Sequence, residues 1–311
     1  MIERFTEEHL ETWRREGVAP IHNFFTSEEV AAVRADFVQV FGRAEGDEEG
    51  LDRKKGDEVG RFHPSQFKGI EAVPVDCSPA LNLIGVHPAL IAFAKRALKA
   101  EAVHLYQCQA WAKFTGEADY DQPFHCDFVN HTLTAPSEDA HLNAVTIMCY
   151  FSDVTDAHGP MAYVTRPDSL KVAGPEATFD FDPERHAALQ AGLRSFGRSS
   201  AAPAGSIVPY GIDIYHRGTN MTAPRGVRYA VMVCYKTASN DAVGYHAWPF
   251  HHTRPWGVIF NNATPEQLAC FGVHSPGHPF WTEETLRRSQ VRYPGWDLSP
   301  YRAAIQTAKA A

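Results

Sequence analysis

The sequence has few cysteines, and none of them are spaced as a metal or redox motif requires. The six are scattered along the chain: Cys77, Cys108, Cys126, Cys149, Cys234 and Cys270. None forms a C-x-x-C pair, which excludes a zinc ribbon and a thioredoxin-like motif. Because several lie within apolar, strand-like runs, we expect reduced thiols that pack as small hydrophobic residues.

Long apolar runs and an excess of basic charge are also missing. No run approaches the roughly 18 apolar residues of a membrane span. Lys and Arg number 29 against 37 Asp and Glu, for a net charge of −8, which disfavours nucleic acid or an anionic membrane as the main partner. The first residues, Met1 to Arg4, have neither the basic nor the apolar region of a signal peptide. We therefore expect a soluble, cytoplasmic protein.

The chain shows no internal repeat and no low-complexity linker, so residues 1–311 are expected to form a single domain. Residues 1–103 have helical signals, such as a capping box from Thr26 to Glu29. Residues 104–236 have the pattern of short strands, and residues 237–311 combine an aromatic loop at 245–256 with further helices. Two of these helices have clear start signals, at Thr264 and Ser299.

Seven runs rich in valine, isoleucine and aromatic residues are separated by turns: His104–Phe114, Phe124–Leu133, Leu142–Val154, Met161–Thr165, Ser206–Tyr210, Ile212–Arg217 and Val227–Lys236. No helix falls regularly between them. This favours a mainly β fold, an antiparallel sandwich or barrel with flanking helices, over a Rossmann sheet.

A candidate metal motif lies in the second of these runs. In a strand, His125 and Asp127 point to the same face. His216, in a later run, supplies a third ligand. Two histidines and one carboxylate form the facial triad of non-haem Fe(II) oxygenases, which leaves open positions for co-substrate and dioxygen.

Two further features fit a 2-oxo acid bound to such a metal. Arg228 begins the last strand and is able to form a bidentate pair with a carboxylate. An unusually polar face is shared by four residues of the first strand: Gln107, Gln109, Trp111 and Lys113. Such a face is expected to line a polar cavity.

At this point the chain resembles the phytanoyl-CoA dioxygenase family of Fe(II)/2-oxoglutarate oxygenases. The resemblance extends over nearly the whole chain and is carried by short segments: Phe24–Val30, His125–Asp127, His158–Val164, Ala204–Val208, Asp213–Asn220, Gly277–Trp281 and Arg292–Leu298. It implies a double-stranded β-helix, a cupin-like jelly-roll core.

The resemblance also implies roles for individual residues. His125, Asp127 and His216 would bind iron, Arg228 would hold the 2-oxoglutarate carboxylate, and Gln109 and Met148 would contact the co-substrate. One departure concerns the turn at 167–170, which lacks the family's usual histidine. Another is the spacing from His216 to Arg228, which is one residue longer than expected. Arg225 is therefore a rival anchor, but Arg228 is favoured because it begins a strand.

The expected activity is a dioxygenase reaction that uses Fe(II), 2-oxoglutarate and O₂. It would hydroxylate or otherwise oxidise a small or mid-sized metabolite and release succinate and CO₂. Trp111 and Asn130 are candidate substrate contacts, and the loop at 245–256 is a candidate lid. A CoA ester is disfavoured, because the basic triplet Arg53–Lys55 is the only basic feature that suggests a phosphate groove.

Two other classes of protein remain open. A cupin-like isomerase or hydrolase would keep the metal triad but would not need Arg228. A non-catalytic binding module is disfavoured by the intact set of four residues.

Overall fold

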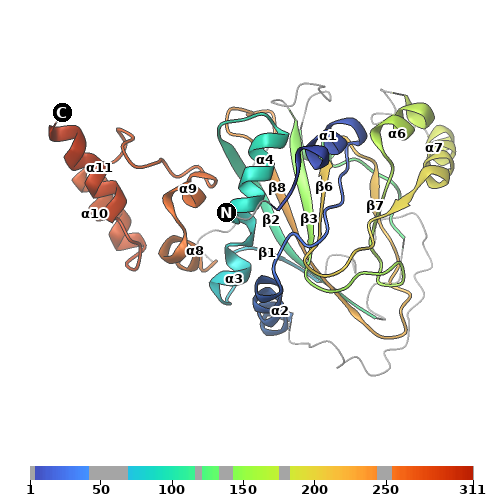
Figure 1. Cartoon of the computed structure of the whole chain (residues 1–311), viewed down its shortest axis with the longest axis horizontal. Helices are drawn as coiled ribbons and strands as arrows, with labels where there is room; N and C mark the ends of the chain where they lie inside the picture. Colours follow the sequence, from blue (N-terminus) through green and yellow to red (C-terminus); the bar gives the residue numbers. More distant parts are fainter. Residues whose placement is uncertain are drawn as a thin grey trace.

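Two antiparallel β-sheets form the centre of the protein, and helices cover one side and both ends (Figure 1). The computed structural model describes residues 4–41, 69–115, 121–132, 143–174, 183–243 and 254–310. The larger sheet has the strand order β1 (Ile70–Ala72), β2 (Val103–Phe114), β8 (Val227–Thr237), β3 (Ala144–Tyr150) and β6 (Ile207–Gly211). The smaller sheet has the order β5 (Arg198–Ser199), β4 (Met161–Tyr163) and β7 (His216–Gly218). This is the double-stranded β-helix that the sequence predicted.

Helices precede, interrupt and follow the strands. Those of the N-terminal part are α1 (Glu7–Glu16), α2 (Ser27–Phe41), α3 (Pro79–Asn82), the 3₁₀ turn η2 (Ile84–Val86) and α4 (Pro88–Ala97). Those between strands are α5 (Phe128–His131), α6 (Arg166–Ala173) and α7 (Pro183–Phe196). The C-terminal helices are α8 (Trp256–Asn262), α9 (Pro265–Ala269), α10 (Glu283–Arg292) and α11 (Ser299–Ala310).

Strand alternation divides the apolar residues into two cores. On β8, Val231, Val233 and Tyr235 join an outer core with the N-terminal helices, while Met232 and Cys234 join an inner core between the two sheets. All are buried, and each such side chain contributes roughly 1.5–3 kcal/mol to folding. The inner core is the side on which the candidate metal ligands lie.

Local signals place the helix ends where the sequence predicted them. The Thr26 hydroxyl accepts from the Glu29 amide at 3.2 Å, and the Glu29 carboxylate accepts from the Thr26 amide at 2.9 Å. A second capping box joins Thr264 and Gln267 at the start of α9. The six cysteines are free thiols, as expected.

Three predicted elements differ in the structure. The described part of Phe124–Leu133 is not a strand: His125 and Thr132 form only isolated bridges, and α5 begins after Asp127, because the amide of Phe128 bonds to the Ile212 carbonyl and that of His131 to the Asp127 carbonyl. The run Ile212–Arg217 is a turn up to residue 215, and the strand begins only at His216. The turn at 167–170 lies within α6.

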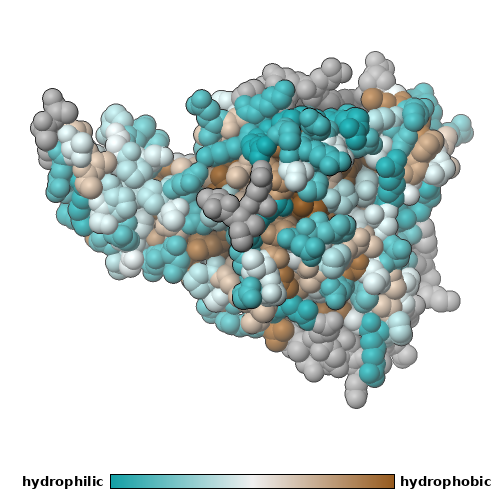
Figure 2. Space-filling model, in the orientation of Figure 1, coloured by the Kyte–Doolittle hydropathy of each residue, from teal (hydrophilic) through white to brown (hydrophobic). Residues whose placement is uncertain are grey.

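The C-terminal region has four helices in the described part of the chain, where start signals predicted two. The α10–α11 hairpin projects from the body, and its visible face is mainly hydrophilic (Figures 1 and 2).

Trp256, in the candidate lid, is buried in α8 and packs on Phe271 with ring centroids 5.5 Å apart. The rest of that loop up to residue 253, and the triplet Arg53–Lys55, lie outside the described residues. Among the described helices, none is both long and apolar enough to cross a bilayer.

Candidate metal centre

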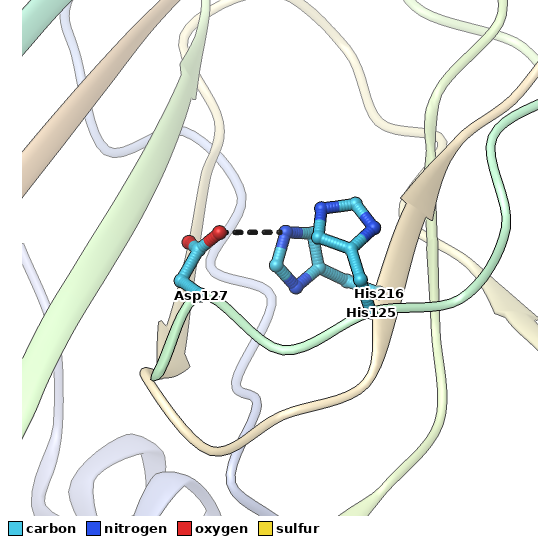
Figure 3. A group of neighbouring side chains, drawn as sticks. All are labelled: His125, Asp127 and His216. Carbon is cyan, nitrogen blue, oxygen red and sulfur yellow. Dashed lines mark ion pairs between the residues drawn. The ribbon is translucent and has the colours of Figure 1, made fainter. Parts of the chain in front are cut away.

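The two candidate histidine ligands lie directly opposite each other. His125 and His216 form an antiparallel bridge in which each amide donates to the other's carbonyl at 2.9 Å. Their rings lie side by side with centroids 4.5 Å apart (Figure 3). The backbone of two segments far apart in sequence therefore sets the relative position of the two imidazoles.

Each imidazole also has a fixed tautomer. Nδ1 of His125 lies 3.0 Å from the carbonyl of Pro123, and Nδ1 of His216 lies 3.0 Å from the carbonyl of Ile214. A carbonyl only accepts, so each Nδ1 carries the proton. The lone pair of both rings is thus on Nε2, which is the arrangement of a metal-binding histidine with an outer hydrogen-bond partner.

Asp127 completes the group from the turn before α5 (Figure 3). Its Oδ1 lies 3.6 Å from Nε2 of His216, and the ligand atoms of the three residues all lie within 4.8 Å of one another. Adjacent ligands with bonds of about 2.1 Å are roughly 3 Å apart at right angles, so a small contraction brings the set onto one ion. Two neutral imidazoles and one carboxylate fit Fe(II).

The protonation states of His125 and Asp127 favour the binding of a cation. Burial, together with the neighbouring His216, lowers the pKa of His125 to about 4, so its imidazole is neutral at neutral pH. Burial raises the pKa of the Asp127 carboxyl, but the nearby imidazoles, His216 foremost, outweigh it and keep that pKa below its usual range. The site therefore combines the carboxylate of Asp127 with the neutral imidazole of His125.

Two buried tyrosines near the metal ligands were not identified from the sequence. The Tyr210 ring lies 4.7 Å from the His216 ring, and its hydroxyl donates to Oδ2 of Asp127 from 3.5 Å. Burial, and then the charge of Asp127, raises the pKa of Tyr210 well above its ordinary value, so the phenol stays a donor. Tyr106 lies 3.0 Å from Nδ1 of His131 on α5. The sequence could have identified Tyr210, because the alternation of its strand places this side chain on the inner face.

The structure distinguishes the two candidate anchors. Arg228, on β8, is 8% exposed. It lies an even number of residues from the inner-core residues Met232 and Cys234, so strand alternation places it on the same face as them. Arg225 is exposed in the preceding turn. Nη1 of Arg228 donates to the carbonyl of Gly159. Directly opposite on β2 lies Lys113, which is 7% exposed and donates from Nζ to the Thr219 carbonyl at 2.5 Å. Two buried cations therefore lie side by side; the sequence identified Arg228 as the anchor and Lys113 only as part of the polar face of this strand.

The other candidate residues divide between the inner face and the surface. Gln109, Met232 and Met148 are paired across three adjacent strands. Trp111 is half-buried, and its Nε1 donates to Oε1 of Gln109 at 3.2 Å. The predicted polar face of β2 is thus present. Asn130, on α5, is exposed.

Comparisons with known proteins agree with this geometry. No curated protein sequence matches the chain. Among solved structures, EctD from S. alaskensis is 17% identical, with a TM-score of 0.56 and 82% of this chain and 84% of that chain covered. The epimerase SnoN, in complex with Fe³⁺, alpha ketoglutarate and nogalamycin RO, is 17% identical, with a TM-score of 0.54 and coverage of 83% and 90%. The carbocyclase SnoK from nogalamycin biosynthesis is 19% identical, with a TM-score of 0.51 and coverage of 79% and 88%.

These similarities show the fold, and the sequence itself shows the family. The signature described as phytanoyl-CoA dioxygenase (PhyH) matches residues 13–224, which include all three candidate metal ligands. The protein therefore belongs to the phytanoyl-CoA dioxygenase family, whose members depend on Fe(II), 2-oxoglutarate and O₂.

Proposed function

We propose that the protein hydroxylates, or otherwise oxidises, a small or mid-sized metabolite at an unactivated C–H bond, with release of succinate and CO₂. The main support is one combination of groups. A His-Asp-His set suited to Fe(II) lies beside the inner-core residue Tyr210, and the buried cation Arg228 alternates in step with the inner-core residues of β8.

In this proposal, the protein binds and orients the reactants. His125, Asp127 and His216 hold one face of the ion, which leaves its other positions open. Arg228, with Lys113 beside it, binds the far carboxylate of 2-oxoglutarate, and Gln109 and Met148 lie between the sheets as co-substrate contacts. When bound, the iron supplies the oxidising chemistry with dioxygen, while the protein orients the target bond and excludes water.

The carboxylate of Asp127 bears on the type of oxidation. It fills the position that related halogenases leave to a halide, so the site favours hydroxylation or another oxidative outcome over halogenation. The structural neighbours SnoN and SnoK are described as an epimerase and a carbocyclase, so epimerisation and ring closure are the other outcomes that a product analysis must distinguish. Trp111 and Asn130 are the proposed substrate contacts.

The competing function is a cupin-like isomerase or hydrolase that uses the same metal site without 2-oxoglutarate. An anaerobic titration distinguishes the two. Fe(II) and then 2-oxoglutarate are added to metal-free protein, and the visible charge-transfer band of a chelated 2-oxo acid is followed. We expect the band in the wild type and its loss in Asp127→Ala and His216→Ala. Iron binding without the band would favour the cupin-like function, and turnover in Asp127→Ala would refute the metal assignment.

A further inference from the structure

The turn between β6 and β7 contacts the chain on either side of Asp127 and the imidazole of His216. Three successive carbonyls of this turn accept hydrogen bonds: Ile212 from the Phe128 amide at 3.0 Å, Asp213 from the Cys126 thiol at 3.2 Å, and Ile214 from Nδ1 of His216 at 3.0 Å. The first two bonds hold the chain on either side of Asp127, and the third orients the imidazole of His216. The position of this turn therefore bears on two of the metal ligands, Asp127 and His216.

A bidentate ion pair holds the turn in place. The guanidinium of Arg166, at the start of α6, donates from Nε to Oδ2 of Asp213 at 2.7 Å and from Nη2 to Oδ1 at 3.1 Å. Its third nitrogen, Nη1, donates to the Arg14 carbonyl near the end of α1 at 2.7 Å. The side chains of Arg166 and Asp213 are 26% and 20% exposed. A forked, charge-assisted pair of this kind fixes direction as well as distance.

Two glycines leave the space that this ion pair occupies. A Cβ on Gly211 would lie 2.4 Å from Oδ1 of Asp213 and 3.1 Å from Nη2 of Arg166. A Cβ on Gly17, whose φ is +77°, would lie 2.1 Å from Cδ1 of Ile214. The amide of Gly211 donates to the carbonyl of Gly17 at 2.9 Å. The backbone thus packs closely around the ion pair.

We propose that Arg166 and Asp213 are positioning residues for the metal centre: their ion pair holds the turn at 212–215 so that its carbonyls orient the ligands. The proposal rests on the proposed metal site and adds an outer layer to it. Loss of an outer hydrogen-bond partner of a metal ligand typically weakens metal binding about 10- to 100-fold. We expect a weakening in this range when the ion pair is broken.

The test measures metal affinity directly. Co(II), an air-stable substitute for Fe(II), is titrated against a chromogenic chelator in the wild type, Arg166→Gln, Asp213→Asn and the double variant. The expected result is a Kd about 10- to 100-fold higher in each single variant. The double variant should bind Co(II) about as tightly as the single variant with the higher Kd, because the two residues act through one ion pair. Arg166→Lys keeps the charge but loses the fork, so it should restore only part of the affinity.

The chain offers a closely matched control. Arg4 donates to both carboxylate oxygens of Glu29, at 2.6 and 3.0 Å, and to the Phe24 carbonyl at 3.0 Å. The side chains of Arg4 and Glu29 are 19% and 30% exposed, similar to those of the Arg166 pair. Arg4→Gln should lower the unfolding midpoint of the metal-free protein about as much as Arg166→Gln, but leave the Co(II) Kd within about twofold.

The possible results test the metal site and the positioning role of the ion pair separately. Wild-type protein that does not bind Co(II) or Fe(II) would refute the metal site itself. A wild type that binds, with Arg166→Gln and Asp213→Asn unchanged in Kd, would refute only the positioning role. An equal loss of affinity in Arg4→Gln would assign the effect to general destabilisation. If Arg166→Gln does not fold, Asp213→Asn and Arg166→Lys provide the same comparison.

Discussion

Replacement of Arg228 is the sharpest test of the co-substrate pocket. Arg228 is 8% exposed and faces the inner core, so a carboxylate bound there is shielded from water. Truncating one partner of a buried, hydrogen-bonded charge pair costs about 2–5 kcal/mol. Because Lys113 remains on the neighbouring strand, the lower part of that range, about 2–3 kcal/mol, applies. This corresponds to a Kd for 2-oxoglutarate that is about 30- to 150-fold higher.

The assay is an anaerobic titration of 2-oxoglutarate into the Fe(II)-loaded protein, followed through the charge-transfer band. Arg228→Gln is compared with Arg225→Ala, which changes an exposed cation three residues away and should raise the Kd less than about threefold. Lys113→Met should show an intermediate effect. A Kd that is unchanged in Arg228→Gln, or raised equally in Arg225→Ala, would refute the assignment of Arg228 as the anchor.

Three other expectations concern the surroundings of the site and the fold. Tyr210→Phe removes the phenol that donates to the metal carboxylate but keeps the ring, so metal affinity should fall up to about tenfold at nearly constant melting temperature. Gly17→Ala combines a left-handed φ of +77° with a clash against Ile214, and should lower the unfolding free energy by about 1–3 kcal/mol in urea. Despite the cost of burial, hydrogen bonds from Arg4 and other neighbours lower the pKa of Glu29 to about 2. This stabilisation is therefore present above about pH 4.5 and is lost as the pH falls toward 2. Arg4→Gln should lower stability by about 1–2 kcal/mol at pH 7 and flatten the acid side of the stability curve, whereas an unchanged curve would contradict the pKa shift.

Local pattern was enough to predict most of the strands, and it brought forward the His-Asp-His candidates that the structure places close together. The alternation of β2 predicted which of its residues share a face, because a side-chain period of two does not depend on the neighbouring strands. The capping boxes of α2 and α9 were equally local. The choice of Arg228 over Arg225 followed from the same reasoning, since only Arg228 lies in a strand, and the structure buries it.

The geometry of the site depends on contacts that are distant in sequence, and these were not predictable. His125 and Asp127 were expected to converge through strand alternation, but a turn brings them together. That turn is held by the Asp213 carbonyl, 87 residues from Cys126, and the partner of the Asp213 carboxylate is 47 residues away. Hydrogen bonds over such separations override the β propensity of the local sequence.

The place of the α10–α11 hairpin at the edge of the fold bears on its local unfolding. Its apolar contacts combine aromatic pairs, such as the Phe260–Tyr293 stack at 3.8 Å and the Trp281–Tyr301 pair at 4.8 Å, with the buried Leu286 and Leu298. It lies beyond residues 13–224, and the three metal ligands lie within them. The hairpin projects from the body (Figure 1), and peripheral segments of this kind exchange their amide hydrogens through local unfolding, at a lower free energy than the global transition. The hairpin is therefore expected to behave as a separate cooperative unit, whose amides exchange early while those of β3 and β8 stay protected.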